Sequence, residues 1–134
     1  MLRFDHLPSD FNPMFLFLGD KQDLQTLANL LRSFAENPRL LDVREQLTGA
    51  KSRTTLRLVP VESEAGDFGM KQERDGFRWG LNAWQAEKIA ERIELLMPAY
   101  QKSGSDIIEL GIEGEIPVKV SLGEFTDDFL VQRF

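Results

Sequence analysis

Residues 77–96, FRWGLNAWQAEKIAERIELL, give the clearest structural pattern in the sequence. Phe77, Trp79 and Leu81 alternate with Arg78 and Gly80, which is the period-two pattern of a strand with one buried face. A helix N-cap residue, Asn82, comes next, and apolar residues then recur on one stripe of a 3.6-residue helix. That stripe consists of Ala86, Ile89, Ala90, Ile93, Leu96, Met97 and Tyr100. The stretch predicts a strand that leads directly into an amphipathic helix, and both apolar faces need a common core.

A second stretch, nearer the N-terminus, has the same plan. Residues 14–18 form a short apolar run, and Asp20 is placed to cap a helix over residues 21–36. This helix ends at Asn37, because a residue that precedes proline is disfavoured in the helical conformation. Its apolar stripe consists of Leu24, Leu27, Ala28, Leu31, Phe34 and Ala35. The chain therefore contains two predicted strand–helix units.

Further strands are predicted around both helices. Asp75-Gly76 is a strong hairpin signal, because both residues tolerate a positive φ. The other predicted strands cover residues 2–6, 39–46, 53–61, 68–73, 106–112 and 116–122. This order predicts an α+β fold of two βαββ(β) units, with an antiparallel-rich mixed sheet and two helices packed on one face.

The two units align at a constant spacing of 62 residues. We therefore predict a single domain over residues 1–134 with an internal duplication, covering about residues 14–61 and 77–122. The alternative is chance agreement, because any two βαββ units share this order of apolar positions. The aligned pairs include Phe15 with Phe77, Phe17 with Trp79, and Asp20 with Asn82.

The composition excludes several kinds of functional site. The chain has no cysteine, which rules out disulfides, thiolate metal ligands and a cysteine nucleophile. Its single histidine, His6, cannot form a histidine-rich metal site. The sequence contains no phosphate-binding loop, dinucleotide fingerprint or nucleophile-elbow motif. We therefore expect no catalytic residue, no bound metal and no cofactor.

Charge and hydropathy predict the compartment and the class of partner. A formal net charge of −6 argues against a nucleic-acid binder, which usually presents a basic face. No apolar run approaches the ~18 residues that a membrane-spanning helix needs. The N-terminus lacks the basic-then-apolar pattern of a signal peptide, so we expect a cytoplasmic protein.

Two apolar residues of the second helix lie outside its core stripe. At ~100° per residue, Trp84 and Leu95 fall almost opposite the core, on a face that is otherwise charged. Exposed tryptophans are enriched where protein partners dock, so we predict an interaction surface here. The alternative is that Trp84, in the first helical turn, folds over the preceding strand or against a loop.

Three further residues are candidates for a site. Phe129 and Phe134 belong to a C-terminal segment that is too apolar for a free tail, and we assign them to the same interaction surface or to docking on the body. Glu109 lies inside a predicted strand, between Ile108 and Leu110, and its alternation places it on the sheet face away from the core. It is the candidate ligand-facing residue.

The repeated βαββ(β) order, in a chain of about this length, resembles the vicinal-oxygen-chelate (glyoxalase/bleomycin-resistance) fold. Metal-binding members of that family use histidines and a glutamate on facing strands, whereas this chain has only His6. The resemblance therefore implies a metal-free relative that binds a small molecule. The acidic charge and small α+β form are also similar to the immunity proteins that neutralise bacterial toxins.

These observations predict a non-enzymatic small bacterial protein-interaction module, toxin-immunity-like or regulatory, that binds a protein partner or itself as a homodimer. The alternative hypothesis is a metal-free small-molecule-binding protein or enzyme with a vicinal-oxygen-chelate-like duplication and Glu109 as its polar group. A deep pocket lined by sheet residues would favour the alternative, and a flat face with exposed aromatic residues would favour the interaction module.

Deleting the residues after Thr126 tests the docking of the C-terminal segment. We expect a lower melting temperature or a smaller oligomer, because Phe129, Leu130, Val131 and Phe134 would leave apolar surface uncovered. Thermal unfolding and sedimentation of the full-length and shortened chains measure both quantities. An unchanged melting temperature together with an unchanged oligomeric state would contradict the prediction.

Overall fold

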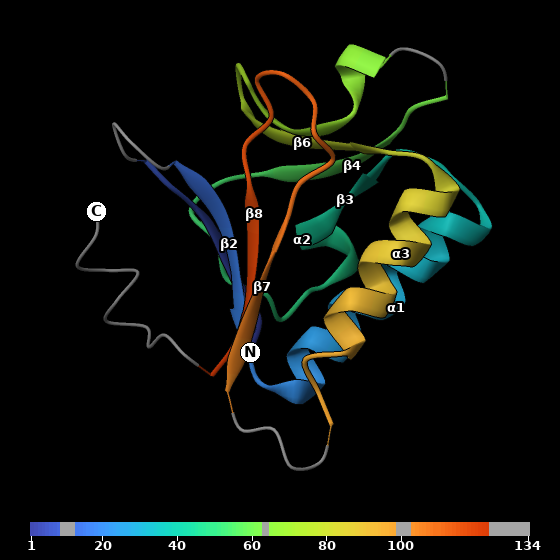
Figure 1. The fold of residues 1–134 in the computed structure, drawn as a ribbon. Helices are drawn as coiled ribbons and strands as arrows, with labels where there is room; N and C mark the ends of the chain where they lie inside the picture. Colours follow the sequence, from blue (N-terminus) through green and yellow to red (C-terminus); the bar gives the residue numbers. More distant parts are fainter. Residues whose placement is uncertain (9–12, 63–64, 99–102, 124–134) are drawn as a thin grey trace.

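The computed structural model describes residues 1–8, 13–62, 65–98 and 103–123 (Figure 1). In these residues it contains the strands β1 (Arg3–Leu7), β2 (Met14–Gly19), β3 (Leu41–Asp42), β4 (Leu56–Pro60), β5 (Gly69–Glu73), β6 (Gly76–Leu81), β7 (Gly104–Ile108) and β8 (Val118–Leu122). The helices are α1 (Lys21–Glu36), α2 (Val43–Gln46), α3 (Ala83–Glu94) and the 3₁₀ turn η1 (Ala65–Asp67).

The strands form two mixed sheets, with the orders β1-β2-β8-β7 and β3-β4-β6-β5. Figure 1 shows α1 and α3 side by side, both on the same side of the sheets. The predicted α+β class, with two helices packed together against mixed sheets, is confirmed. The strands divide between two sheets rather than forming one, and each sheet takes strands from both halves of the chain.

The two halves exchange strands through a pair of parallel ladders. β2 of the first half pairs with β8 of the second, and β6 of the second half pairs with β4 of the first. The registers agree: Phe15 lies opposite Val118 in one ladder, and Phe77 lies opposite Leu56 in the other. Residues 62 positions apart therefore occupy equivalent places in the two ladders. A common origin of the halves stays a prediction, now with a structural correspondence to support it.

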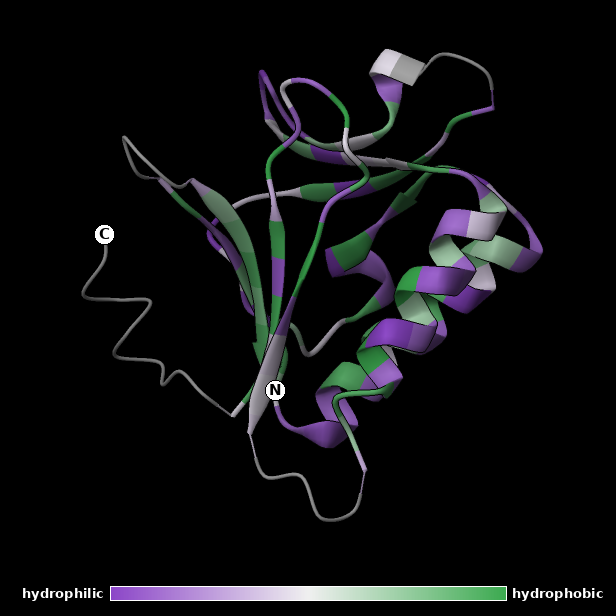
Figure 2. Cartoon of the chain, viewed as in Figure 1, coloured by the Kyte–Doolittle hydropathy of each residue, from purple (hydrophilic) through white to green (hydrophobic). Residues whose placement is uncertain are grey.

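Equivalent aromatic residues from the two halves meet in the core. The ring centroids of Phe15 and Phe77 are 5.2 Å apart, and those of Phe17 and Trp79 are 5.6 Å apart. Trp79 is only 1% exposed. Burying such large rings in contact with one another makes both a hydrophobic and an aromatic contribution to stability. In Figure 2 hydrophobic and hydrophilic positions alternate along α1 and α3, as in helices with one buried face.

Both long helices begin with the same N-terminal capping arrangement. In α1, Asp20 accepts a hydrogen bond from the Asp23 backbone N–H, and the Asp23 carboxylate accepts one from the Asp20 N–H. Asn82 and Gln85 form the corresponding reciprocal pair in α3. Such capping boxes satisfy backbone donors that a helix start would otherwise leave free. Both predicted N-caps are therefore present.

Two predicted strands differ from the structure. Residues 39–46 contain only the two-residue β3 and then α2, because the Asp42 side chain caps the turn by accepting from the Glu45 N–H at 3.1 Å. β7 ends at Ile108 rather than at residue 112. Beyond it, the Glu115 carboxylate accepts from three successive backbone N–H groups, of Leu110, Gly111 and Ile112, and so fixes a loop in place of a longer hairpin.

Sheet β1-β2-β8-β7 has a second apolar face. Leu16 and Leu18, which point away from the main core, are both buried and form a separate cluster with Leu7. β8, the neighbour of β2, leads into the C-terminal segment whose docking was predicted. Phe129 and Phe134 lie outside the described residues, so that docking stays a prediction.

The exchange of strands predicts that neither half folds alone. Fragments 1–63 and 64–134 should each lack a cooperative thermal transition. The first fragment contains β2 and β4 without their parallel partners, and the second contains β6 and β8 without theirs. An equimolar mixture should recover near-ultraviolet circular dichroism from the packed aromatic core. The thermal transition and the circular dichroism of the intact chain serve as the reference. A cooperative transition in either isolated fragment would contradict the prediction.

Candidate interaction surface

Helix α3 turns one face to the core. Ala86, Ile89, Ala90 and Ile93 are buried there, as the sequence stripe predicted. The small Ala86 and Ala90 side chains allow close approach to α1, which packs along α3. This face is therefore committed to the fold and cannot take part in binding.

The flank of α3 toward α1 is occupied by an ion-pair network. Arg32 of α1 donates to the carboxylates of both Glu87 and Glu94. The amide of Gln25 donates to Glu94 at 3.0 Å. The hydrogen bond from Arg32, with a second from Gln25, holds the pKa of the Glu94 carboxyl below its usual range. Both carboxylates are therefore paired within the chain, and together with Arg32 they leave one net negative charge on this flank.

The opposite flank is held by Arg92. Its guanidinium donates to the two carboxylate oxygens of Asp106 at 2.8 and 2.7 Å and to the backbone oxygen of Ile107 at 2.9 Å. A bidentate arginine–carboxylate pair of this kind fixes geometry as well as charge. It ties α3 to β7, so this flank is also occupied by contacts within the chain.

The outward face of α3 carries an exposed stripe made of Trp84, Lys88, Glu91 and Leu95. Trp84 is 68% exposed and Leu95 is 76% exposed. The Lys88 ammonium lies 5.7 Å from the centroid of the Trp84 ring and 3.3 Å from the Glu91 carboxylate. The alternative that Trp84 folds over a strand or loop is wrong, because its first-turn position turns the ring outward. We refer to these four residues as the α3 stripe.

Helix α1 supplies an internal comparison for the α3 stripe. At positions 62 residues earlier, α1 carries uncharged polar side chains, Gln22, Thr26, Asn29 and Ser33. The first three of them are exposed and Ser33 is half-buried. An outward helix face in this fold therefore needs no tryptophan, leucine or charged pair. The α3 stripe is an addition to what the fold requires, and sequence alignment of the two halves could have found it.

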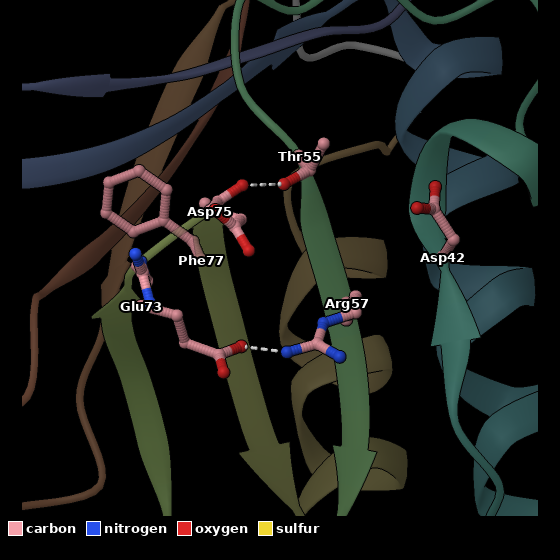
Figure 3. Close-up of a pocket in the computed structure, with 8 residues that line it drawn as sticks. Asp42, Thr55, Arg57, Glu73, Asp75 and Phe77 are labelled. Carbon is pink, nitrogen blue, oxygen red and sulfur yellow. Dashed lines mark hydrogen bonds and ion pairs between the residues drawn. The ribbon is translucent and has the colours of Figure 1, made fainter.

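A shallow hollow lies on sheet β3-β4-β6-β5 (Figure 3). Its volume is about 320 Å³. Arg57 donates to Glu73 across it, and the Thr55 hydroxyl donates to the Asp75 backbone oxygen at 2.7 Å. These groups are therefore already engaged with one another. The lining residues are Asp42, Thr55, Arg57, Glu73, Arg74, Asp75, Gly76 and Phe77.

The remaining candidates do not come together. Glu109 is exposed in the loop after β7 and is not among the residues that line this hollow. Phe129 and Phe134 lie outside the described residues. Within residues 1–8, 13–62, 65–98 and 103–123, no three His, Cys, Asp or Glu side chains are grouped so that they could hold a metal ion.

Comparisons with known proteins give no assignment. No protein-family profile, no curated protein and no solved structure matches the chain. A membrane span needs a long apolar helix, and the described part of the chain has none. The geometry of the surface therefore carries the functional argument.

His6 packs its ring against Phe77, with 4.9 Å between the centroids. Burial lowers the pKa of the His6 imidazole below its usual value of 6.5, and the nearby Asp5 carboxylate opposes this only in part. The unfolded chain then binds the proton more tightly than the folded one. The contribution of His6 to stability is therefore complete above the unfolded pKa and is lost as the pH falls through that value toward the folded pKa.

Acidification from about pH 7.5 to about pH 5.5 should consequently lower the melting temperature of the wild type more than that of His6→Gln. The difference between the two decreases should be at most about 2–4 °C, since the ring is only partly buried. Calorimetry of both proteins at the two pH values measures the difference. An equal change in both proteins would show that His6 does not carry it.

Proposed function

We propose that this chain is a non-enzymatic protein-interaction module that binds a protein partner through the α3 stripe. The observation that carries the proposal is the exposure of Trp84 and Leu95 at positions where α1 keeps Gln22 and Ser33. In this proposal the protein works in the cytoplasm, in a toxin-immunity-like or regulatory setting, and does not bind nucleic acid.

The chemistry of the α3 stripe supports protein binding. Tryptophan is among the residues that contribute most to binding energy at protein interfaces, because burying its large ring removes much apolar surface from water. The contact between Lys88 and the Trp84 ring limits the rotamers of both side chains before a partner arrives. Less side-chain entropy is then lost on binding. The charged centre of the stripe also limits the partners that fit.

The small-molecule alternative has weaker support. Sites for small molecules are mostly apolar and enclosed, with volumes of about 300–1,000 Å³. The hollow on sheet β3-β4-β6-β5 is at the small end of that range, and charged side chains dominate its lining. Its Arg57–Glu73 pair would have to open before either group could bind a ligand. Glu109, which the alternative needs as its polar group, is exposed elsewhere.

Site-specific photo-crosslinking tests the proposal in cells in which the protein naturally occurs. A photoactivatable phenylalanine analogue at Lys88 should form a covalent adduct with a protein, because this position lies between Trp84 and Leu95. The matched control places the same analogue at Thr26, 62 residues earlier on α1, where we expect at least about fivefold less adduct. Equal adduct yields at the two positions would overturn the proposal.

The double variant Trp84→Gln/Leu95→Ser, which gives α3 the residues of α1, separates binding from stability. We expect it to abolish the adduct at position 88 while moving the melting temperature by no more than about 2 °C, since exposed side chains contribute little to folding. Trp79→Ala is the contrasting variant. Its ring is buried, so we expect a loss of about 3–5 kcal/mol of folding stability.

A further inference from the structure

The α3 stripe has the same spacing in both directions, and reversing it places each apolar residue against an apolar one and each charge against its opposite. Its order is apolar, cation, anion, apolar, with spacings of four, three and four residues. At ~100° per residue, all four side chains lie within about 60° of one another on the helix surface. The centre of the pattern falls between Ile89 and Ala90. Such a stripe is complementary to itself when two copies of the helix run antiparallel.

We propose that the partner of the α3 stripe is the same stripe on a second copy of this chain, in an antiparallel pair with two-fold symmetry. This inference rests on the proposed function and names its partner. Trp84 packs on Leu95 of the second copy, and Lys88 faces Glu91 of the second copy. The symmetry forms each of these contacts twice, as in any isologous interface.

The charges select this arrangement over its alternatives. A parallel pairing in register would place Lys88 opposite Lys88 and Glu91 opposite Glu91, and like charges brought together at an interface are costly. The antiparallel pairing gives every charge an opposite partner. It also sets the dipoles of the two helices in opposition. The charged groups on the two flanks are already paired within the chain, Glu87 and Glu94 with Arg32, and Arg92 with Asp106.

The size of the contact sets its strength. Two tryptophans and two leucines, with the charged pairs between them, bury less than the ~1,200 Å² of a standard stable interface. We therefore expect a reversible dimer with a dissociation constant in the micromolar range or weaker. A dimer of this strength responds to protein concentration, so the fraction assembled follows the amount of protein in the cell.

Charge reversal on the full chain tests the arrangement. Lys88→Glu and Glu91→Lys should each weaken self-association by about tenfold, because each replaces two attractive contacts in the dimer by two repulsive ones. The double variant Lys88→Glu/Glu91→Lys should restore wild-type association. An equimolar mixture of the two single variants should form a heterodimer more tightly than either variant forms a homodimer. Analytical ultracentrifugation from low micromolar to near-millimolar concentration measures all four.

Two variants of α1 serve as controls, and the crosslinking experiment separates this inference from the proposed function. Thr26→Glu and Asn29→Lys, at the equivalent positions of α1, should leave self-association unchanged. A wild type that stays monomeric throughout the concentration range, or single variants that associate as the wild type does, would overturn the inference. An adduct at position 88 with a different protein, without self-association, would overturn the second copy as partner and leave the proposed function standing. Equal adduct yields at positions 88 and 26 would instead overturn the proposed function itself.

Discussion

Two parallel ladders join the halves of this chain and fix the positions of its other elements. β2 pairs with β8 and β6 pairs with β4, so neither half contains a complete sheet. The ladders bring the inward rows of both halves into one core, where Phe17 stacks on Trp79. Parallel strands normally require buried faces. On the inner side that requirement is met here, because the inward rows of both sheets share one core with α1 and α3.

The same pairing determines how α1 and α3 meet. Each helix follows its strand after a single capping residue, so fixing β2 and β6 also fixes where the helices start. The helices then pack along each other, and Arg32 of α1 reaches two carboxylates of α3. Polar groups on both flanks of α3 are occupied in this way. The outward stripe from Trp84 to Leu95 is the face that these contacts leave exposed.

Much of this could be predicted because it depends on residues close together in the chain. Asp20 and Asn82 cap the helices through hydrogen bonds that reach only three residues along the chain. The exposure of Trp84 follows from helical geometry alone. The prediction was wrong where a short-range polar contact outweighed strand propensity, as with the Asp42 cap of α2 and the Glu115 carboxylate that shapes the loop after β7.

Most of the elements, their order and their buried faces could be read from the sequence, because periodicity and capping are local properties of the chain. Only the tertiary structure decided which strands become neighbours. Phe77 pairs with Leu56 of the preceding half, although any other strand with an apolar face offers the same backbone groups. The pairing depends on fitting all the apolar faces into one core at once. That fit also decided which charged side chains of α3 are paired within the chain, since their partners Arg32 and Asp106 lie outside α3.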